Sequence, residues 1–425
     1  MNIQHLSIRN FRNFESLDIS FDENLTLIVG ANGAGKTTLM DAVAVSLGTV
    51  FTALDGLAGV SINKQDARLS AFQLGSGEDV QAAYPVVISA EGTMDGHPVH
   101  WGRSLNGEKG STTVKNAQDL IRIIKSYQDR LRAGDRSLAL PIIAYYGTGR
   151  LWDYHRAKKT NKFKTNTRTN GYMDCLDGTT NAKLMLDWFR QMEFKRFDED
   201  LKSLPELTAV YGAMETCLSR AGYVDAKIHY TPKQNELFIS YDAQGGRIKL
   251  PLNQLSDGYK VVSSLIADIA YRMAVLNPQY LDRVTQETDG IVLIDEIDLH
   301  LHPAWQQRIL QDLREIFPKV QFIVSTHAPA VIHSITADHL RILNNDCLEM
   351  PAQQTFGRDA NGIFRSVMGV SERPAEIIAR FKSFYEFLDN EEFDDAEQVL
   401  DLLEEDIGED PEIASCRVQL DLERR

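Results

Sequence analysis

Residues 25–37 read LTLIVGANGAGKT and carry the strongest structural signal in the chain. The first five residues form a continuous apolar run, which is typical of a strand that is buried on both faces of a sheet. The next eight match the pattern GxxxxGK[ST], in which a glycine-rich loop joins a strand to a helix. We therefore predict one βα unit of an α/β domain, with its helix over Lys36–Leu47.

The glycine-rich loop predicts a site for the phosphates of ATP. Glycines let backbone N–H groups point into the loop, and the helix N-terminus adds the positive end of its dipole. Lys36 would reach the β- and γ-phosphates, the Thr37 hydroxyl would ligate Mg²⁺, and Thr38 would contact the α-phosphate. The predicted nucleotide-binding residues of this loop are Gly30, Asn32, Gly33, Ala34, Gly35, Lys36, Thr37 and Thr38.

Two further buried strands end in polar residues. Ile291–Ile294 leads to Asp295, which would hold Mg²⁺ directly or through water, and to Glu296, which would polarise the attacking water. The strand that ends at His327 would place an imidazole against the γ-phosphate, or simply hold a structural histidine. The predicted catalytic residues are Lys36, Glu296 and His327, and the predicted metal ligands are Thr37 and Asp295.

A fourth motif, LSDGYK (255–260), begins a predicted helix and is weak by itself. In their order, however, the four motifs resemble the ABC-type ATPase heads of SMC, RecF and OLD proteins. This resemblance implies homo-oligomers in which two heads sandwich ATP and Mg²⁺, with Ser256, Gly258 and Lys260 acting on the partner's nucleotide. The sequence departs from the LSGGQ of transporters, which makes a transporter subunit the less favoured alternative.

Four longer strings resemble a compact bacterial subfamily that includes the PtuA-type ATPases of Septu and retron anti-phage systems. That resemblance implies a separate HNH nuclease of the PtuB type and, in a retron, a reverse transcriptase with its nucleic acid. We see no nuclease constellation in this sequence, so we expect another polypeptide to cut DNA. A RecF-like repair ATPase is the alternative. The strings are LPIIAYYGTGRLW (140–152), DEIDLHLHPAWQQ (295–307), STHAP (325–329) and FGRDANGIFRSVMGVSERP (356–374).

The expected fold class is α/β: an ABC-type P-loop ATPase head, with a mixed sheet and flanking helices. Residues 1–50 and 225–350 would form the head, and 51–224 a compact α+β insertion with a hairpin, a basic loop and helices. Residues 351–425 would form an acidic C-terminal helical hairpin.

Charge is distributed unevenly along the 425 residues, whose formal net charge is −15. The last 40 residues hold 16 acidic and three basic side chains, which suits either a docking surface for a basic partner or a hairpin packed on the head. Residues 115–170 hold 13 basic and four acidic side chains. This segment is predicted either to contact DNA or RNA phosphates or to be a solvated loop.

Further features of the sequence argue against a membrane protein, a secreted protein and a metal or redox site. No stretch approaches 18 apolar residues and the N-terminus lacks an apolar signal core, so we expect a cytoplasmic protein without a membrane contact. The four cysteines show no CxxC spacing, which disfavours a zinc or redox site. His300 and His302 lack a third metal ligand, and the resemblance places them beside Asp298 at the head–head interface.

Three further residues are candidates for contact with the nucleotide. Gln65 and Asp66 are weak candidates for the glutamine loop of the family. Arg150 follows a predicted buried strand and would contact either a phosphate or a structural carboxylate.

Overall fold

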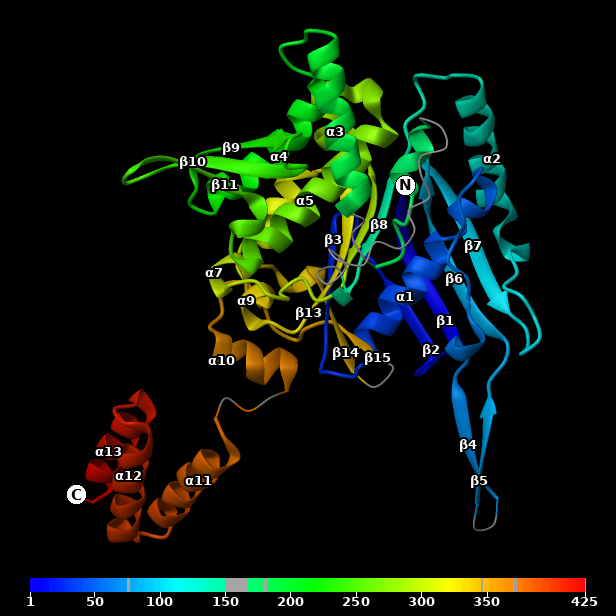
Figure 1. The fold of residues 1–425 in the computed structure, drawn as a ribbon. Helices are drawn as coiled ribbons and strands as arrows, with labels where there is room; N and C mark the ends of the chain where they lie inside the picture. Colours follow the sequence, from blue (N-terminus) through cyan, green and yellow to red (C-terminus); the bar gives the residue numbers. More distant parts are fainter. Residues whose placement is uncertain are drawn as a thin grey trace. The chain divides into compact units, whose positions relative to one another are not determined.

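The computed structural model describes residues 1–74, 77–149, 167–178, 182–344, 347–369, 371 and 373–424. The chain forms two compact units, which we call the head unit (Met1–Arg358) and the tail unit (Asp359–Arg425). Figure 1 shows the strands gathered in the head unit, while the tail unit is helical. No helix in the described ranges is long and apolar enough to cross a membrane.

A six-stranded sheet forms the centre of the head unit, in the order β15-β14-β3-β13-β12-β8. Its strands run parallel except for β15, which pairs antiparallel with β14. Strands β3, β8, β12 and β13 are buried along their whole length, which explains their apolar runs. The bounds are β3 Leu25–Val29, β8 Ile142–Tyr146, β12 Gly290–Ile294, β13 Val320–Thr326, β14 Leu340–Asn344 and β15 Cys347–Glu349.

Helix α1 (Lys36–Leu47) follows β3 through the glycine-rich loop and has the bounds predicted from the sequence. Helix α5 (Asp257–Leu276) is the long central helix, and it begins at the LSDGYK motif. The segment after β12 forms two short helices, α7 (Pro303–Gln306) and α8 (Ile309–Ile316). The other helices are α2 Gln118–Arg132, α3 Ala182–Asp198, α4 Pro205–Arg220, α6 Val284–Glu287 and α9 Pro329–Ile332.

Three smaller sheets complete the head unit. An antiparallel sheet has the order β2-β1-β6-β7, and the turn between its last two strands is Asp95-Gly96, with positive φ at both residues. A second has the order β11-β10-β9, and a third is the two-stranded ribbon β4-β5, which the sequence did not suggest. The bounds are β1 Asn2–Phe11, β2 Phe14–Ser20, β4 Leu69–Leu74, β5 Gly77–Ala82, β6 Val86–Met94, β7 His97–Leu105, β9 Val224–Thr231, β10 Glu236–Ala243 and β11 Gly246–Pro251.

A buried ion pair joins α5 to the central sheet. The side chains of Asp268 and Arg272 are both 1% exposed, and Arg272 Nε donates to Asp268 Oδ2 at 2.7 Å. The Tyr146 hydroxyl, at the end of β8, donates to the same carboxylate oxygen at 2.7 Å. Arg272 Nη1 also donates to the carbonyls of Gly171 and Met173, both at 2.9 Å. The pair therefore holds α5, β8 and the segment around 171–173 together.

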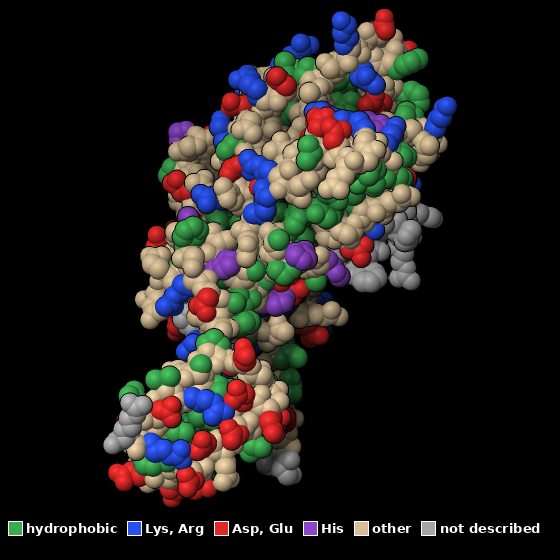
Figure 2. All heavy atoms as spheres, turned by 90° about the vertical axis from the view of Figure 1, so that its left-hand side faces the viewer, with side chains coloured by type: hydrophobic (Ala, Val, Ile, Leu, Met, Phe, Trp, Pro, Cys, Tyr) green, Lys and Arg blue, Asp and Glu red, His purple; other side chains and the backbone are tan. Residues whose placement is uncertain are grey.

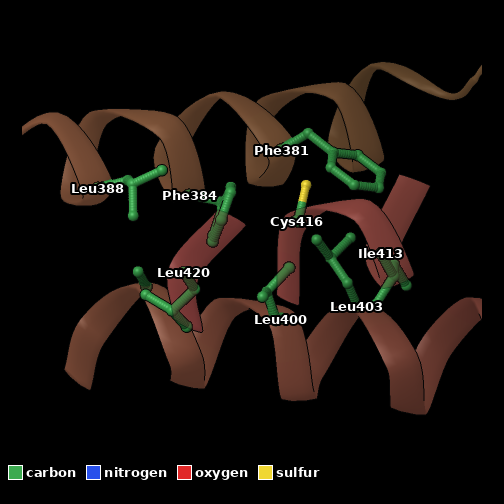
Figure 3. Close-up of a cluster of buried hydrophobic side chains, with 9 residues drawn as sticks. Phe381, Phe384, Leu388, Leu400, Leu403, Ile413, Cys416 and Leu420 are labelled. Atoms are coloured by element: carbon green, nitrogen blue, oxygen red, sulfur yellow. The ribbon is translucent and has the colours of Figure 1, made fainter. Parts of the chain in front are cut away.

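The tail unit packs three long helices around a core of its own, where a hairpin of two had been expected. Figure 3 shows α13 crossing between α11 and α12, with Cys416 and Leu420 among the apolar side chains of the other two helices. The third helix was missed because α13 carries apolar residues outside its buried positions as well, which weakens its amphipathic pattern. The helices are α10 Ala360–Ile363, α11 Ala375–Asp389, α12 Phe393–Ile407 and α13 Pro411–Glu423.

Several arginine side chains of the tail unit form ion pairs with carboxylates of the same unit. Arg417 Nη2 lies 2.8 Å from Asp401 Oδ1, and Arg424 Nη1 lies 2.9 Å from Glu397 Oε2, so both tie α13 to α12. Figure 2 shows carboxylates spread over the face of this unit that is in view. The excess of negative charge is therefore displayed on the surface. The three-part division into head, insertion and tail remains a prediction, although the described boundary after Arg358 lies near the predicted start of the tail.

Candidate functional site

The glycine-rich loop closes around the side chain of Lys36. Lys36 is 6% exposed, and its Nζ donates to the carbonyls of Gly30 at 2.8 Å and Ala31 at 3.1 Å. The ammonium group is thus held inside the loop, at the position from which a lysine reaches phosphates. Burial lowers the pKa of Lys36, while the nearby carboxylates of Glu296 and Asp295 oppose that shift.

Gly35 shows why this loop needs glycine. Its φ is +99°, in the left-handed region, and a Cβ there would lie 2.6 Å from Asn13 Nδ2 and 2.7 Å from the Phe14 ring. The turn between β1 and β2 therefore packs directly beneath the loop. The sequence analysis did not assign a role to Asn13. The repeat of Asn-Phe on either side of Arg12 is the sequence feature that could have drawn attention to this turn.

The end of β12 is joined to the start of α1 by one short hydrogen bond. Thr37 Oγ1 donates to Asp295 Oδ2 at 2.7 Å, and the Asp295 side chain is fully buried. The Ser325 hydroxyl, at the end of β13, donates to the other oxygen of Asp295 and accepts from the Glu296 N–H at 2.8 Å. The structure thus brings both predicted metal ligands together and adds Ser325, which the sequence argument did not assign. Ser325 could have been inferred because the C-terminal ends of parallel strands lie at the same edge of a sheet, where ligands bind.

Glu296 and His327 lie around the same pair of strand ends. Glu296 is a non-glycine residue with a φ of +48°, a conformation that costs energy and often marks a functional position. The Thr326 hydroxyl donates to Asp298, and His327 Nε2 lies 3.5 Å from Asp298 Oδ2. The predicted catalytic residues Lys36, Glu296 and His327 are therefore grouped at one edge of the sheet, and their catalytic roles remain predictions.

The LSDGYK motif lines a different pocket, of about 810 Å³. A Cβ on Gly258 would lie 2.9 Å from the His300 carbonyl oxygen, so the loop after β12 packs closely against the start of α5. Lys260 is held by Asp257, with Nζ 3.1 Å from Oδ1. The pocket is lined by Arg220, Ala221, Ser256, Asp257, Gly258, Tyr259, His300, Leu301, His302, Ala304, Trp305 and Arg308.

His300 and His302 lie in the segment between β12 and α7. Within the described part of the chain, no group of three or more His, Cys, Asp or Glu side chains could hold a metal ion. His302 instead caps α7, since its Nδ1 accepts from the Ala304 N–H at 3.3 Å. Figure 2 shows several histidine side chains on the face of the head unit in view.

Asp66 belongs to a polar cluster at the base of α1. Arg12 Nε donates to Asp66 Oδ1 at 2.8 Å and also pairs with Asp41. The hydroxyl of Tyr145 donates to Asp41 Oδ1 at 2.9 Å, and burial raises the pKa of this tyrosine. Asp66 is therefore tied to Arg12, while Gln65 is exposed. Arg150 and most of the basic loop, 154–166, lie outside the described residues.

Comparison with known proteins gives this geometry a family context. Residues 5–213 match a family model described as an AAA domain, and residues 183–333 match an AAA domain described as a putative AbiEii toxin of a type IV TA system. The chain is 26% identical to a retron Ec83 probable ATPase from Escherichia coli, covering 100% of this chain and 87% of that protein. It is 25% identical to a Septu protein PtuA from Bacillus thuringiensis, covering 92% and 90%. The chain is a homologue of the retron and Septu PtuA ATPases. These matches support ATPase activity.

A solved structure, that of an SMC head bound to the C-terminal winged-helix domain of ScpA, is similar to this chain with a TM-score of 0.47 and 16% identity. The match covers 82% of this chain and 96% of that one. The assignment of the head fold depends on this chain's own central sheet, its glycine-rich loop and α1.

Proposed function

We propose that this chain is the ATP-binding and ATP-hydrolysing subunit of a bacterial anti-phage defence complex. In this proposal, ATP-dependent dimerisation of the heads controls a partner nuclease that acts on DNA. The observation that carries the ATPase part is the cluster of Lys36, Thr37, Asp295 and Glu296 at one sheet edge. The defence setting follows from the similarity to retron and Septu ATPases, and the cytoplasmic location predicted from the sequence belongs to the same proposal.

The residues present fit Mg²⁺ and ATP. Magnesium prefers oxygen ligands and is commonly held by one or two protein groups together with phosphates. The Thr37 hydroxyl and the Asp295 carboxylate, in contact at 2.7 Å, supply such a pair, and the Lys36 ammonium supplies charge for the phosphates. When bound, Mg·ATP provides the phosphoryl group. Lys36 would then neutralise phosphate charge, Thr37 and Asp295 would hold the metal, and Glu296 would accept the proton of the attacking water.

Substitution of Glu296 tests this assignment. Glu296→Gln keeps the shape of the side chain but removes its basicity, so we expect hydrolysis to fall about 10²–10⁴-fold with nucleotide binding retained. Phosphate release and nucleotide binding are measured on the same preparation. Glu108→Gln, the same change at an exposed glutamate outside the four motifs, is the matched control. If Glu296→Gln hydrolyses ATP at the rate of the unaltered chain, Glu296 is not the base.

Head dimerisation is proposed because Ser256 and Gly258 line an open pocket apart from the phosphate loop. In such dimers these residues, with Lys260, would meet the nucleotide of the second head. Light scattering of Glu296→Gln should show an increase in mass on adding Mg·ATP, which Ser256→Arg should abolish. The same mass with and without Mg·ATP would contradict this part of the proposal.

The partner nuclease, of HNH or PtuB type, is proposed to dock on the acidic tail unit, although the alternative that this unit serves only as packing stays open. A retron would add a reverse transcriptase and its nucleic acid. The test is co-purification with the product of the neighbouring gene, with and without ATP, followed by an assay on plasmid DNA. A complex without nuclease activity would favour the alternative of a RecF-like repair ATPase.

Residues 115–170 are the proposed contact to DNA or RNA. Within the described part, α2 presents Arg122 and Arg132 on the surface, the latter paired with Asp55 at 2.7 Å. Joint neutralisation of five basic residues outside the described ranges should weaken binding and flatten its dependence on salt. Unchanged affinity and salt slope would rule this contact out. The five are Arg156, Lys158, Lys159, Lys162 and Lys164.

A further inference from the structure

Asp298 and His327 form a contact that the proposed mechanism does not use. The Asp298 side chain is 6% exposed, and its Oδ2 lies 3.5 Å from His327 Nε2. Its other oxygen accepts from the Thr326 hydroxyl, which itself accepts from the Ala328 N–H at 3.0 Å. The backbone holds the same residue, since the Asp298 carbonyl accepts from the Leu301 N–H at 3.0 Å. The Asp298 carboxylate is therefore fixed beside the imidazole.

The imidazole of His327 has one nitrogen that can meet an anion. Nδ1 is buried and has no hydrogen-bond partner within the described part of the chain. Nε2 faces Asp298, and the His327 side chain as a whole is 43% exposed, so a ligand can approach the ring. A separation of 3.5 Å is longer than the roughly 2.7–2.9 Å of a strong charged hydrogen bond. The imidazole can therefore exchange Asp298 for an acceptor that lies closer.

Asp298 also lies close to the groups that would hold the phosphates. Burial lowers the pKa of Lys36, and Asp298 is one of three carboxylates that oppose this shift. The residues two before and two after Asp298, which are Glu296 and His300, have φ of +48° and +64°. Such backbone conformations cost energy and often mark a functional segment. A carboxylate at this place repels the γ-phosphate of ATP most strongly, and ADP lacks that group.

We propose that His327 exchanges Asp298 for the γ-phosphate of ATP, so that Asp298 sets how strongly the site prefers ATP to ADP. The inference rests on the proposed function and adds a specificity-determining residue to it. With ADP in the site, His327 Nε2 keeps Asp298 as its partner. With ATP, Nε2 donates to a phosphate oxygen, while the carboxylate keeps its bond from the Thr326 hydroxyl. The contact between Asp298 and His327 therefore differs between the two nucleotide states.

Binding of Mg·ATP and Mg·ADP to Asp298→Asn tests the exchange, because asparagine can still accept from Thr326 but carries no charge. All variants also carry Glu296→Gln, which slows the proposed hydrolysis. The ratio of ATP affinity to ADP affinity, measured by titration calorimetry, should rise roughly three- to fivefold, as for an ion pair with one half-exposed member. In His327→Ala the same change should alter the ratio much less. Asp282→Asn, exposed and outside the four motifs, is the matched control and should leave the ratio unchanged.

An equal rise in the ratio with and without His327, or no rise in either background, overturns the proposal. Failure of the intact chain to bind Mg·ATP would overturn the proposed function as well, whereas normal binding with an unchanged ratio overturns only the exchange. NMR of protein with isotope-labelled histidine gives a second measurement that leaves Asp298 unaltered. The Nε2 resonance of His327, assigned by its loss in His327→Ala, should shift more with Mg·ATP than with Mg·ADP, and equal shifts would also overturn the proposal.

Discussion

Replacing Arg272 with methionine should strongly destabilise the head unit. The change keeps an apolar stem but leaves the Asp268 carboxylate, 1% exposed, with the Tyr146 hydroxyl as its remaining side-chain donor. It also removes the donor to the carbonyls of Gly171 and Met173. Burial alone would lower the pKa of Arg272, but Asp268 together with Tyr271, Tyr146 and Cys175 outweighs it and holds that pKa well above its usual value. Arg272 and Asp268 therefore depend on each other for a hydrogen-bonding partner inside the head unit.

Breaking a buried ion pair by removing one partner costs about 3–5 kcal/mol. At roughly 2 °C per kcal/mol for a unit of this size, the melting temperature should fall by about 6–10 °C. The assay is thermal unfolding followed by circular dichroism, with Arg314→Met on the exposed face of α8 as the control, expected within about 0.5 kcal/mol of the unaltered chain.

The double variant Arg272→Met with Asp268→Leu separates the loss of the pair from the loss of packing. Removing both charges leaves no carboxylate buried without its cation, so the double variant should recover about 1–3 kcal/mol relative to the sum of the single changes. The reasoning is refuted if Arg272→Met unfolds at the same temperature as Arg314→Met, or if the two single effects simply add.

Three further changes test other contacts. Gly258→Ala places a Cβ 2.9 Å from the His300 carbonyl oxygen. ATP hydrolysis should therefore fall at least about tenfold, while the melting temperature drops by no more than a few degrees. Full activity would show that the loop around His300 can move to accommodate the Cβ. Ser325→Ala removes the hydroxyl that Asp295 accepts from, and steady-state kinetics should show kcat reduced about 10–100-fold with little change in KM, unless the carboxylate needs no such support. Phe384→Ala, at a fully buried position, should cost the tail unit about 3–5 kcal/mol and make it sensitive to limited proteolysis, with a head fragment that stays intact; a protected tail would contradict the core shown in Figure 3.

The sequence was most informative where one physical requirement dominates. The strands β3, β12 and β13 are buried on both faces, so each is rich in apolar residues and could be predicted from that composition. The loop before α1 needs glycine at Gly35 because its φ is +99°. Lys36, Thr37 and Asp295 could be named because residue type and spacing are fixed by the phosphate chemistry.

Other features depend on long-range packing and were missed. Ser325 reaches Asp295 only because β13 lies next to β12, and the sequence of neither strand indicates that the two are adjacent. The ribbon β4-β5 was not predicted because its exposed strands do not pack on a core and therefore lack a regular alternation of apolar and polar residues. Helix α13 was missed because its outer face also carries exposed Val418 and Leu422.

The most direct test of the central claim is the binding of Mg·ATP to the intact chain and to Lys36→Ala, measured by titration calorimetry. In the proposed site Lys36 would donate charged hydrogen bonds to two phosphates, at about 1.5–3 kcal/mol each, so its removal should weaken binding by at least about a hundredfold. Asn253→Ala, on the surface before α5, should bind as the unaltered chain does. If Lys36→Ala binds Mg·ATP with the affinity of the intact protein, the glycine-rich loop is not the nucleotide site and the account fails.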